Sequence, residues 1–431
     1  MTATRRPLTV RLSRLDELYL VLDDGREPWN VHFEAHCTGR LDADRLVDAI
    51  RTAARRHPLA RARLTSWHYA DRGYHWQIDD ALVDVPLRVV PCPDDAALAT
   101  AREHLLERSP PLDAPPPFEL LLARGPAGDS LVLNLHHAVA DGISAMRLLA
   151  SILRAYAGED DPSPPLDPLA VREVHALAGA STLADRLLRV RALAQHGGTR
   201  AGGPARVALD EASDRPGYGV ELLALSREET VATRDRRTEG TTVNDVLLAA
   251  LAVAIRRWNK AHGAPNRRVM LSMPINLRPP EWRTDVLGNF ASYVSLSGSI
   301  AASFQSALEC IGRQTRAVER DGLGGVVVDM LAGCSVLTTA SRRAFADVTQ
   351  ASGSLAVDSA SLSDLGVLPS MGDGVESVWF SPPGRMPLGV AVGAATHDGR
   401  IRLAIRYRYE QFDRAAARSF ALLYRDTLVT G

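Results

Sequence analysis

The chain contains almost no lysine, few cysteines and no long apolar run. Lys260 is its only lysine among 50 basic residues, which balance 51 acidic residues to a net charge of −1. Because no excess of positive charge is available to attract a phosphate backbone, a nucleic-acid partner is not expected. The arginine bias, together with the abundance of alanine, indicates a genomic coding preference and says nothing about the mechanism of the protein.

The four cysteines form no C-x-x-C pair, so neither a zinc knuckle nor a redox dithiol is expected. They are Cys37, Cys92, Cys310 and Cys334, and we expect them to be reduced, buried thiols. The N-terminal residues lack the apolar region of a signal peptide, and no stretch approaches the ~18 apolar residues of a membrane span. The sequence therefore predicts a cytoplasmic protein without a membrane span.

A chain of 431 residues, 46% of them hydrophobic and 23% charged, is too long for one ordinary core and has no signature of disorder. Strand and helix patterns alternate in both halves, which predicts two α/β subdomains over residues 1–157 and 220–431. Clusters of proline and glycine near 159–168 and 197–204 indicate a loose crossover over 158–219, with a helix at about 169–195.

The second half contains three clear local signals. Thr242-Val-Asn-Asp245 has the spacing of a capping box before a buried helix over 242–258. Residues 267–276 read as a central strand. Asp398-Gly399, the preferred dipeptide of a two-residue turn, predicts a hairpin between 388–397 and 400–410, with a closing helix from Asp413.

Residues 131–142, Leu-Val-Leu-Asn-Leu-His-His-Ala-Val-Ala-Asp-Gly, place an apolar strand directly before a helix. Side chains alternate across a strand, so His137 shares a face with Leu131, Leu133 and Leu135, whereas His136 lies on the other face. The two histidines therefore cannot both reach the same substrate.

The segment His136-His137-Ala-Val-Ala-Asp141-Gly142 resembles the motif of the CoA-dependent acyltransferases. This superfamily includes nonribosomal peptide condensation domains, polyketide-associated acyltransferases and bacterial wax ester synthases. Further segments on both sides of this motif are similar to the superfamily and occur in the expected order. They lie at 11–16, 39–58, 117–120, 243–246, 274–278 and 288–290. The resemblance implies two chloramphenicol-acetyltransferase-like α/β sandwich domains with the active-site channel between them.

The resemblance makes His137 the catalytic base, which suits a neutral imidazole near pH 7, and gives His136 a structural role. Asp141 precedes a helix that it can cap, and the resemblance adds an ion pair with Arg278. Gly142 lets the backbone approach the substrate and can offer its N–H to an oxyanion.

Three further residues could line the channel. Asn244 and Asp245 are equally well explained by helix capping, and Asn289 belongs to the similar segment at 288–290.

Other patterns have ordinary explanations. His32, Glu34 and His36 share a strand face and could bind a metal. An exposed polar strand face is the more common reason for such a pattern, and the superfamily that the sequence resembles uses no metal. No metal is expected. The basic stripe Arg400 to Arg408 predicts a solvated strand face, with docking of a phosphopantetheine or carrier-protein phosphate as the alternative. The glycines of 322–325 follow a helix, which disfavours a nucleotide-binding loop.

The expected activity is acyl transfer from a thioester, either acyl-CoA or an acyl carrier protein, to a hydroxyl of a small natural-product or lipid acceptor. No Gly-x-Ser-x-Gly elbow is present, so we expect direct transfer in a ternary complex without a permanently bound cofactor. Similarity at 242–258 and 274–278 to the wax ester synthase and polyketide-associated branches favours an ester. The alternatives are a free-standing condensation enzyme that forms an amide and a non-catalytic recruitment domain, which the intact motif disfavours.

Overall fold

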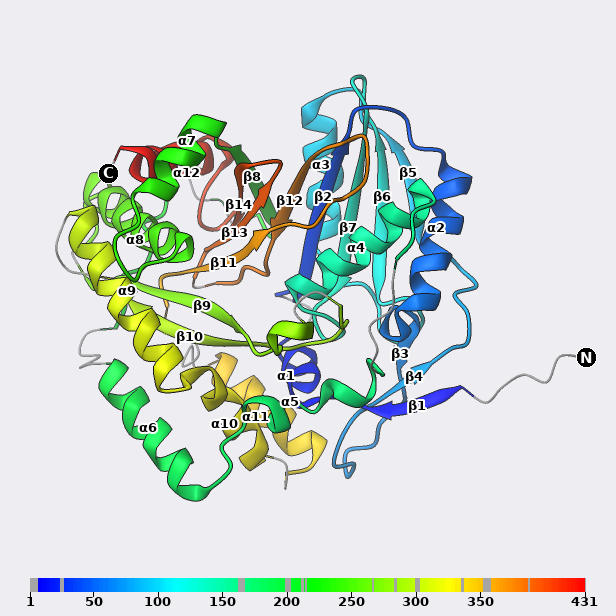
Figure 1. Cartoon of the computed structure of the whole chain (residues 1–431), viewed down its shortest axis with the longest axis horizontal. Helices are drawn as coiled ribbons and strands as arrows, with labels where there is room; N and C mark the ends of the chain where they lie inside the picture. Colours follow the sequence, from blue (N-terminus) through cyan, green and yellow to red (C-terminus); the bar gives the residue numbers. More distant parts are fainter. Residues whose placement is uncertain are drawn as a thin grey trace, which may run out of the picture.

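The computed structural model describes residues 7–23, 27–161, 167–197, 203–210, 213, 215–265, 267–282, 285–298, 303–334, 337–351, 358–386 and 388–430. Two large β-sheets, each covered by helices, give an α/β structure with two lobes (Figure 1). No helix within these ranges is long and apolar enough to cross a bilayer.

The first lobe is built on a five-stranded sheet with the order β12-β2-β7-β6-β5. The strands are β2 (Asn30–Cys37), β5 (Leu87–Pro91), β6 (Phe118–Arg124), β7 (Asp129–His136) and β12 (Val375–Ser381). Its helices are α1 (Arg14–Leu22), α2 (Ala43–Arg56), α3 (Asp95–Leu106) and α4 (Gly142–Ala157). A smaller sheet contains β1 (Leu8–Arg11), β4 (His75–Ile78) and β3 (Ala62–Leu64), the last of which follows η1 (Pro58–Arg61).

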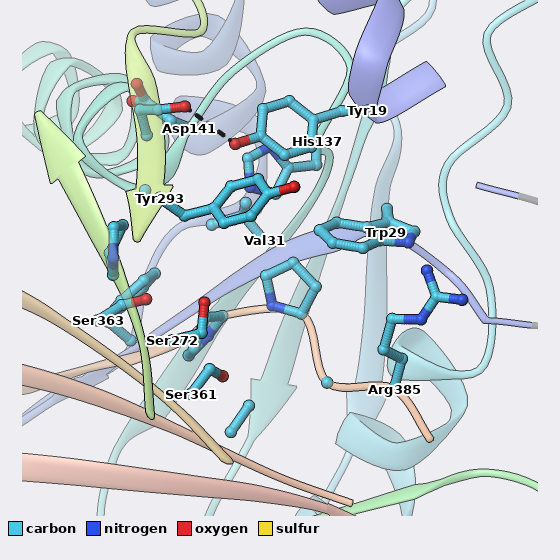
Figure 2. A pocket seen from close by; sticks show the side chains of 18 of the residues that line it. Tyr19, Trp29, Val31, His137, Asp141, Ser272, Tyr293, Ser361, Ser363 and Arg385 are labelled. Carbon is cyan, nitrogen blue, oxygen red and sulfur yellow. Dashed lines mark hydrogen bonds between the residues drawn. The ribbon is translucent and has the colours of Figure 1, made fainter. Parts of the chain in front are cut away.

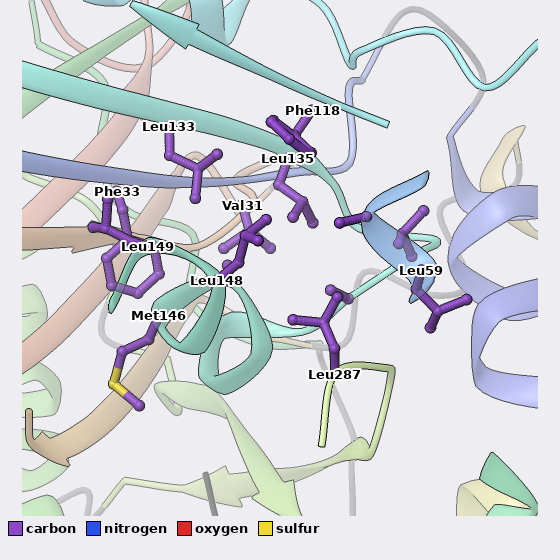
Figure 3. Close-up of a cluster of buried hydrophobic side chains, with 14 of the residues drawn as sticks. Val31, Phe33, Leu59, Phe118, Leu133, Leu135, Met146, Leu148, Leu149 and Leu287 are labelled. Carbon is purple, nitrogen blue, oxygen red and sulfur yellow. The ribbon is translucent and has the colours of Figure 1, made fainter. Parts of the chain in front are cut away.

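Apolar side chains alternate across β7 and fill both sides of this sheet. Leu133 and Leu135 pack with Leu148 and Leu149 of α4 in the main core (Figure 3), whereas Val132 packs with residues of α3 in a smaller cluster. Leu287, from the second half of the chain, also lies in the main core, so the two halves share apolar packing.

The second lobe is built on a six-stranded sheet with the order β10-β9-β11-β13-β14-β8. The strands are β8 (Tyr218–Ala224), β9 (Met270–Asn276), β10 (Ala291–Ser297), β11 (Ala360–Val367), β13 (Val390–His397) and β14 (Arg400–Arg408). Its main helices are α7 (Arg227–Asp235), α8 (Val243–Ala261), α9 (Phe304–Arg320) and α12 (Arg414–Val429). The remaining pieces are η3 (Pro280–Trp282), η4 (Leu323–Gly325), α10 (Val326–Gly333) and α11 (Thr339–Ala351).

The local signals of this lobe are confirmed. Thr242 and Asp245 form a reciprocal capping box at the start of α8, in which residues 245–255 are buried on every side. Asp398 and Gly399 turn between β13 and β14 with φ angles of 46° and 69°, the left-handed values that a two-residue hairpin turn requires. Asp413 caps α12.

One strand crosses between the lobes. β12 belongs to the C-terminal half of the sequence, yet it pairs antiparallel with β2, with Phe380 opposite Phe33. The sequence analysis predicted separate subdomains at 1–157 and 220–431 and did not predict this shared strand. The pairing joins residues more than 300 positions apart, which no local pattern reveals. The boundaries themselves stay a prediction.

The crossover contains no continuous helix over 169–195. It consists of η2 (Ala170–Arg172), α5 (Val174–Ala178) and α6 (Leu183–Gly197). Thr182 and Asp185 exchange side-chain to backbone hydrogen bonds of 3.0 and 3.1 Å, which begins a new helix there.

All four cysteines are free thiols, but only two are buried. Cys37 and Cys92 are buried, whereas Cys310 and Cys334 are half-buried, so the expectation of four buried thiols holds for the first pair alone.

Candidate active site

The corner between β7 and α4 separates the two histidines, as the strand alternation predicts. His137 lines a cavity between the lobes. His136 points away from it, where its Nδ1 accepts the Ala138 N–H at 3.1 Å and its Nε2 lies 3.5 Å from Asp23 Oδ2. Burial lowers the pKa of His136 to about 4, against the opposing charge of Asp23. His136 is therefore a neutral side chain that fixes the corner.

The cavity has a volume of about 260 Å³ and takes its walls from both lobes (Figure 2). α1 and β2 contribute one side, β9, β10 and β11 another, and β12 with the loop that follows it closes the remainder. This is the interdomain channel that the sequence analysis expected.

Aromatic rings hold the His137 imidazole in place. The Tyr19 ring stacks on it with a centroid distance of 3.9 Å and an angle of 27°, and Trp29 meets it edge-on at 6.1 Å. The Tyr19 hydroxyl donates to the Ala291 carbonyl at 3.0 Å, which ties α1 to β10 beside the histidine.

The His137 ring is uncharged near pH 7. Its residue is 8% exposed, and burial lowers its pKa below the ordinary 6.5, although the Asp141 charge and Asn289 oppose the shift. Nδ1 is buried without a hydrogen-bond partner among the described residues. Because Nδ1 is enclosed, Nε2 is the nitrogen left to face the cavity.

Asn289 supports the corner from behind. Its Nδ2 donates to the carbonyls of His137 and Ala138 at 2.9 and 3.0 Å and to Asp16 Oδ1 at 3.0 Å. It is 2% exposed and is absent from the cavity wall, so the expected lining role is wrong. A side chain that binds two consecutive carbonyls acts on the geometry of the corner.

The ion pair that the resemblance implied between Asp141 and Arg278 is present. Arg278 Nη1 and Nη2 donate to the two carboxylate oxygens of Asp141 at 2.8 and 2.9 Å, and the side chains are 0% and 3% exposed. Asp141 also accepts the backbone N–H groups of Ser144 at 3.0 Å and Phe290 at 2.9 Å. Although burial alone would raise the Asp141 pKa, Arg278 and the N–H groups of Phe290 and Ser144 together outweigh it and the pKa is lowered.

Gly142 is the first residue of α4 and lines the cavity. A Cβ at this position would lie 3.0 Å from the Phe380 ring and 3.3 Å from Leu365 Cδ2, so a side chain would crowd the cavity wall. The glycine thus keeps the backbone accessible at the N-terminus of a 16-residue helix.

Asn244 and Asp245 do not meet His137 in this cavity. Asp245 is buried in the capping box of α8 and does not line this cavity. Asn244 lines a second cavity, and its Nδ2 lies 3.1 Å from Met273 Sδ. The expectation that both residues line the catalytic channel is therefore not met.

The cavity has a polar wall and an apolar wall. Hydroxyl side chains of β9, β10 and β11 point into it in Figure 2, and they make no hydrogen bond to another described residue: Ser272, Tyr293, Ser361 and Ser363. The facing wall is apolar and contains Trp29, Val31, Phe380, Pro382 and Leu388. The sequence analysis missed these residues, although Ser361 and Ser363 alternate with Leu362 in the pattern of a sheet with one polar face.

Of the residues considered for a metal, Glu34 is engaged with His36 and Arg102, and His32 is buried. Glu34 forms a buried pair with Arg102, with Nη2 to Oε1 at 2.7 Å, and binds His36 Nε2 at 2.6 Å. Burial lowers the pKa of His32 to about 3. Within the described ranges no group of three metal-binding side chains is found.

The arginine stripe of β14 is not a solvated face. Arg400 is exposed, but Arg402, Arg406 and Arg408 are 7%, 0% and 6% exposed. Arg406 Nη1 donates to Asn30 Oδ1 of β2 at 2.8 Å and stacks on Tyr218. The expectation of a solvated stripe is wrong because this face of β14 packs against the first lobe.

Comparisons with known proteins agree with this architecture. Residues 19–176 match the family model described as Condensation domain. The uncharacterized protein Rv2305 of Mycobacterium tuberculosis (strain ATCC 25618 / H37Rv) is 35% identical over 434 residues, which cover 98% of this chain and 99% of that protein. A candidate diacylglycerol O-acyltransferase of the same organism is 27% identical over 285 residues, 58% of this chain and 59% of its own length.

Solved structures share the fold at low identity. The first condensation domain of the calcium-dependent antibiotic synthetase has a TM-score of 0.72 at 15% identity, over 98% of this chain and 97% of that one. The epimerization domain of the third module of tyrocidine synthetase B has a TM-score of 0.66 at 19% identity, over 98% and 96%.

Proposed function

Because the chain belongs to the CoA-dependent acyltransferase superfamily, we propose that it transfers an acyl group from a thioester to a hydroxyl of a small natural-product or lipid acceptor. The observation that carries this proposal is the neutral His137 imidazole in the wall of the interdomain cavity. A lowered pKa keeps the ring free to accept a proton at neutral pH.

His137 acts as the general base in this proposal. Its Nε2 takes the proton of the acceptor hydroxyl while that oxygen attacks the thioester carbonyl. The C–O bond forms, the C–S bond then breaks, and the same proton passes from His137 to the departing thiolate. Tyr19 and Asn289 hold the imidazole and its backbone in position for both transfers.

The backbone N–H of Gly142 is the proposed donor to the oxyanion of the tetrahedral intermediate, since the N-terminus of α4 favours negative charge. Asp141 takes no proton in this scheme, because Arg278 and two backbone N–H groups engage its carboxylate. Asp141 and Arg278 are therefore positioning residues.

The two walls of the cavity indicate the class of acceptor. Unpartnered hydroxyls on β9 and β11 suit an acceptor with polar groups, and the facing apolar wall suits an attached carbon skeleton. The acyltransferase name of one mycobacterial relative supports an oxygen acceptor. No permanently bound cofactor is proposed; CoA or a phosphopantetheine carrier brings the acyl group, and transfer takes place in the cytoplasm, where such donors are made.

A second candidate is amide formation by a free-standing condensation enzyme with a carrier-bound donor. It is favoured by the Condensation domain match over residues 19–176 and by solved neighbours from peptide synthetases. The two candidates share His137 as base and differ in the acceptor.

Mass-spectrometric screening of acyl-CoA and acyl-carrier donors against alcohols and amines tests the proposal. We expect ester products with alcohols. Amide products alone would favour the second candidate, and no product with any donor would contradict acyl transfer.

A further inference from the structure

The sheet of the second lobe opens between β9 and β11. These strands are paired only at Leu271 with Ala360 and at Ser272 with Ser361. Beyond this point β9 continues beside β10 and β11 beside β13, and Figure 1 shows the two pairs diverging. Pro274 lies just past the last pair, where its missing N–H prevents it from donating to the ladder.

A second cavity, of about 570 Å³, lies against the other face of β9. Met273, Ile275 and Leu277 line it, in alternation with the residues of β9 that face His137. Three residues border both cavities, namely Pro274, Asn276 and Asp364. These residues lie along the opening between β9 and β11, so only this layer of side chains stands between the two cavities.

Among the described residues, the wall of the second cavity is largely apolar, its arginine is paired, and it also includes the exposed carboxylate of Glu319. Its apolar side chains include Met273, Ile275, Leu277 and Val318. Arg189, the arginine among the described residues of the wall, donates to Asp329 Oδ2 at 2.9 Å and to the Ala178 carbonyl at 2.8 Å. Burial raises the pKa of Asp364, although the hydrogen bond from the Gly366 N–H opposes the shift. This chemistry suits an uncharged alkyl chain.

We propose that the second cavity binds an alkyl chain of a substrate whose reacting group lies at His137, with the chain passing between β9 and β11 beside Pro274 and Asp364. The inference rests on the proposed acyl transfer and names a substrate class for it. The chain belongs either to the acyl donor or to the acceptor. Each methylene that enters the cavity should strengthen binding about fourfold.

A binding experiment tests the site without turnover. Thr315 of α9 is half-buried in the wall of the second cavity, so Thr315→Trp fills it, whereas Arg313→Trp puts the same ring on the exposed side of that helix. With cis-parinaric acid as a fluorescent probe, wild type and Arg313→Trp should bind alike and Thr315→Trp at least tenfold more weakly.

Leu277→Trp, at the residue that follows β9, enters the same cavity from the opposite side and should have the same effect if Thr315→Trp does not fold. Equal probe binding by wild type and a folded filled variant, or no binding by wild type, would overturn the proposal.

Turnover with chains of different length then identifies the source of the chain. The donor acyl length is varied against one acceptor, and the acceptor chain against one donor. Thr315→Trp should lower kcat/KM at least tenfold for chains of about twelve carbons in one of the two series, while acetyl transfer changes less than twofold. Unchanged long-chain transfer in both series would overturn the proposal. A wild type that binds the probe but transfers no acyl group would contradict the proposed function instead.

Discussion

Replacing Asp141 or Arg278 by alanine should lower the free energy of unfolding by about 3 to 5 kcal/mol, because each change leaves the other charge buried and unpaired. The side chains are 3% and 0% exposed and are joined by two hydrogen bonds. Asp141→Ala also removes the N-cap of α4, which adds about 1 kcal/mol. The double variant should lose much less than the sum, with a coupling energy of up to about 3 kcal/mol.

Urea unfolding followed by tryptophan fluorescence measures the free energy of unfolding of wild type, of the two single variants and of the double variant. The ion pair between Arg227 and Asp398 provides the control. Its side chains are 55% and 62% exposed, and Arg227 Nη2 lies 2.6 Å from Asp398 Oδ2. Its coupling energy should be only about 0.2 to 1 kcal/mol. If the Asp141 and Arg278 losses simply add, the pair does not stabilise the corner and the positioning role argued for it fails.

Three more predictions follow from the corner. The transfer rate should fall with decreasing pH and reach half its maximum below pH 6.5, because burial lowers the pKa of His137 and its neutral form persists to lower pH; a half-maximal rate at or above pH 6.5 would contradict this. His136→Ala should cost about 1 to 3 kcal/mol of stability in urea unfolding, since it leaves the buried Ala138 N–H without its acceptor, and an unchanged midpoint would refute that role. Gly142→Ala should lower both Tm and kcat/KM because its Cβ would lie 3.0 Å from Phe380, and Phe380→Leu should restore part of each; failure of this rescue would show that the Phe380 contact is not the cause.

Local sequence signals predicted the geometry of the corner between β7 and α4. The alternation along β7 separated His136 from His137, and the position of Asp141 before α4 indicated its capping role. Each of these features depends on residues within a few positions of one another, so backbone geometry alone determines them. The turn at Asp398 and Gly399 is of the same kind.

Features that depend on distant residues were missed. Arg406 looked solvated because arginines are rarely buried, but Asn30, 376 positions away, provides its hydrogen-bond acceptor. Tyr19 stacks on His137 from a helix near the N-terminus, and no local pattern marks it as a wall of the cavity. The opening between β9 and β11 also arises from pairing between distant strands.

The measurement that tests the central claim most directly is product formation by His137→Ala. With a donor and acceptor found for wild type, the variant should form ester product about 10² to 10⁴ times more slowly, because the general base is removed. Its Tm should fall only modestly, since the imidazole Nδ1 makes no hydrogen bond among the described residues and the loss is limited to the ring contacts with Tyr19 and Trp29. Turnover near the wild-type rate in a folded His137→Ala variant would contradict the account.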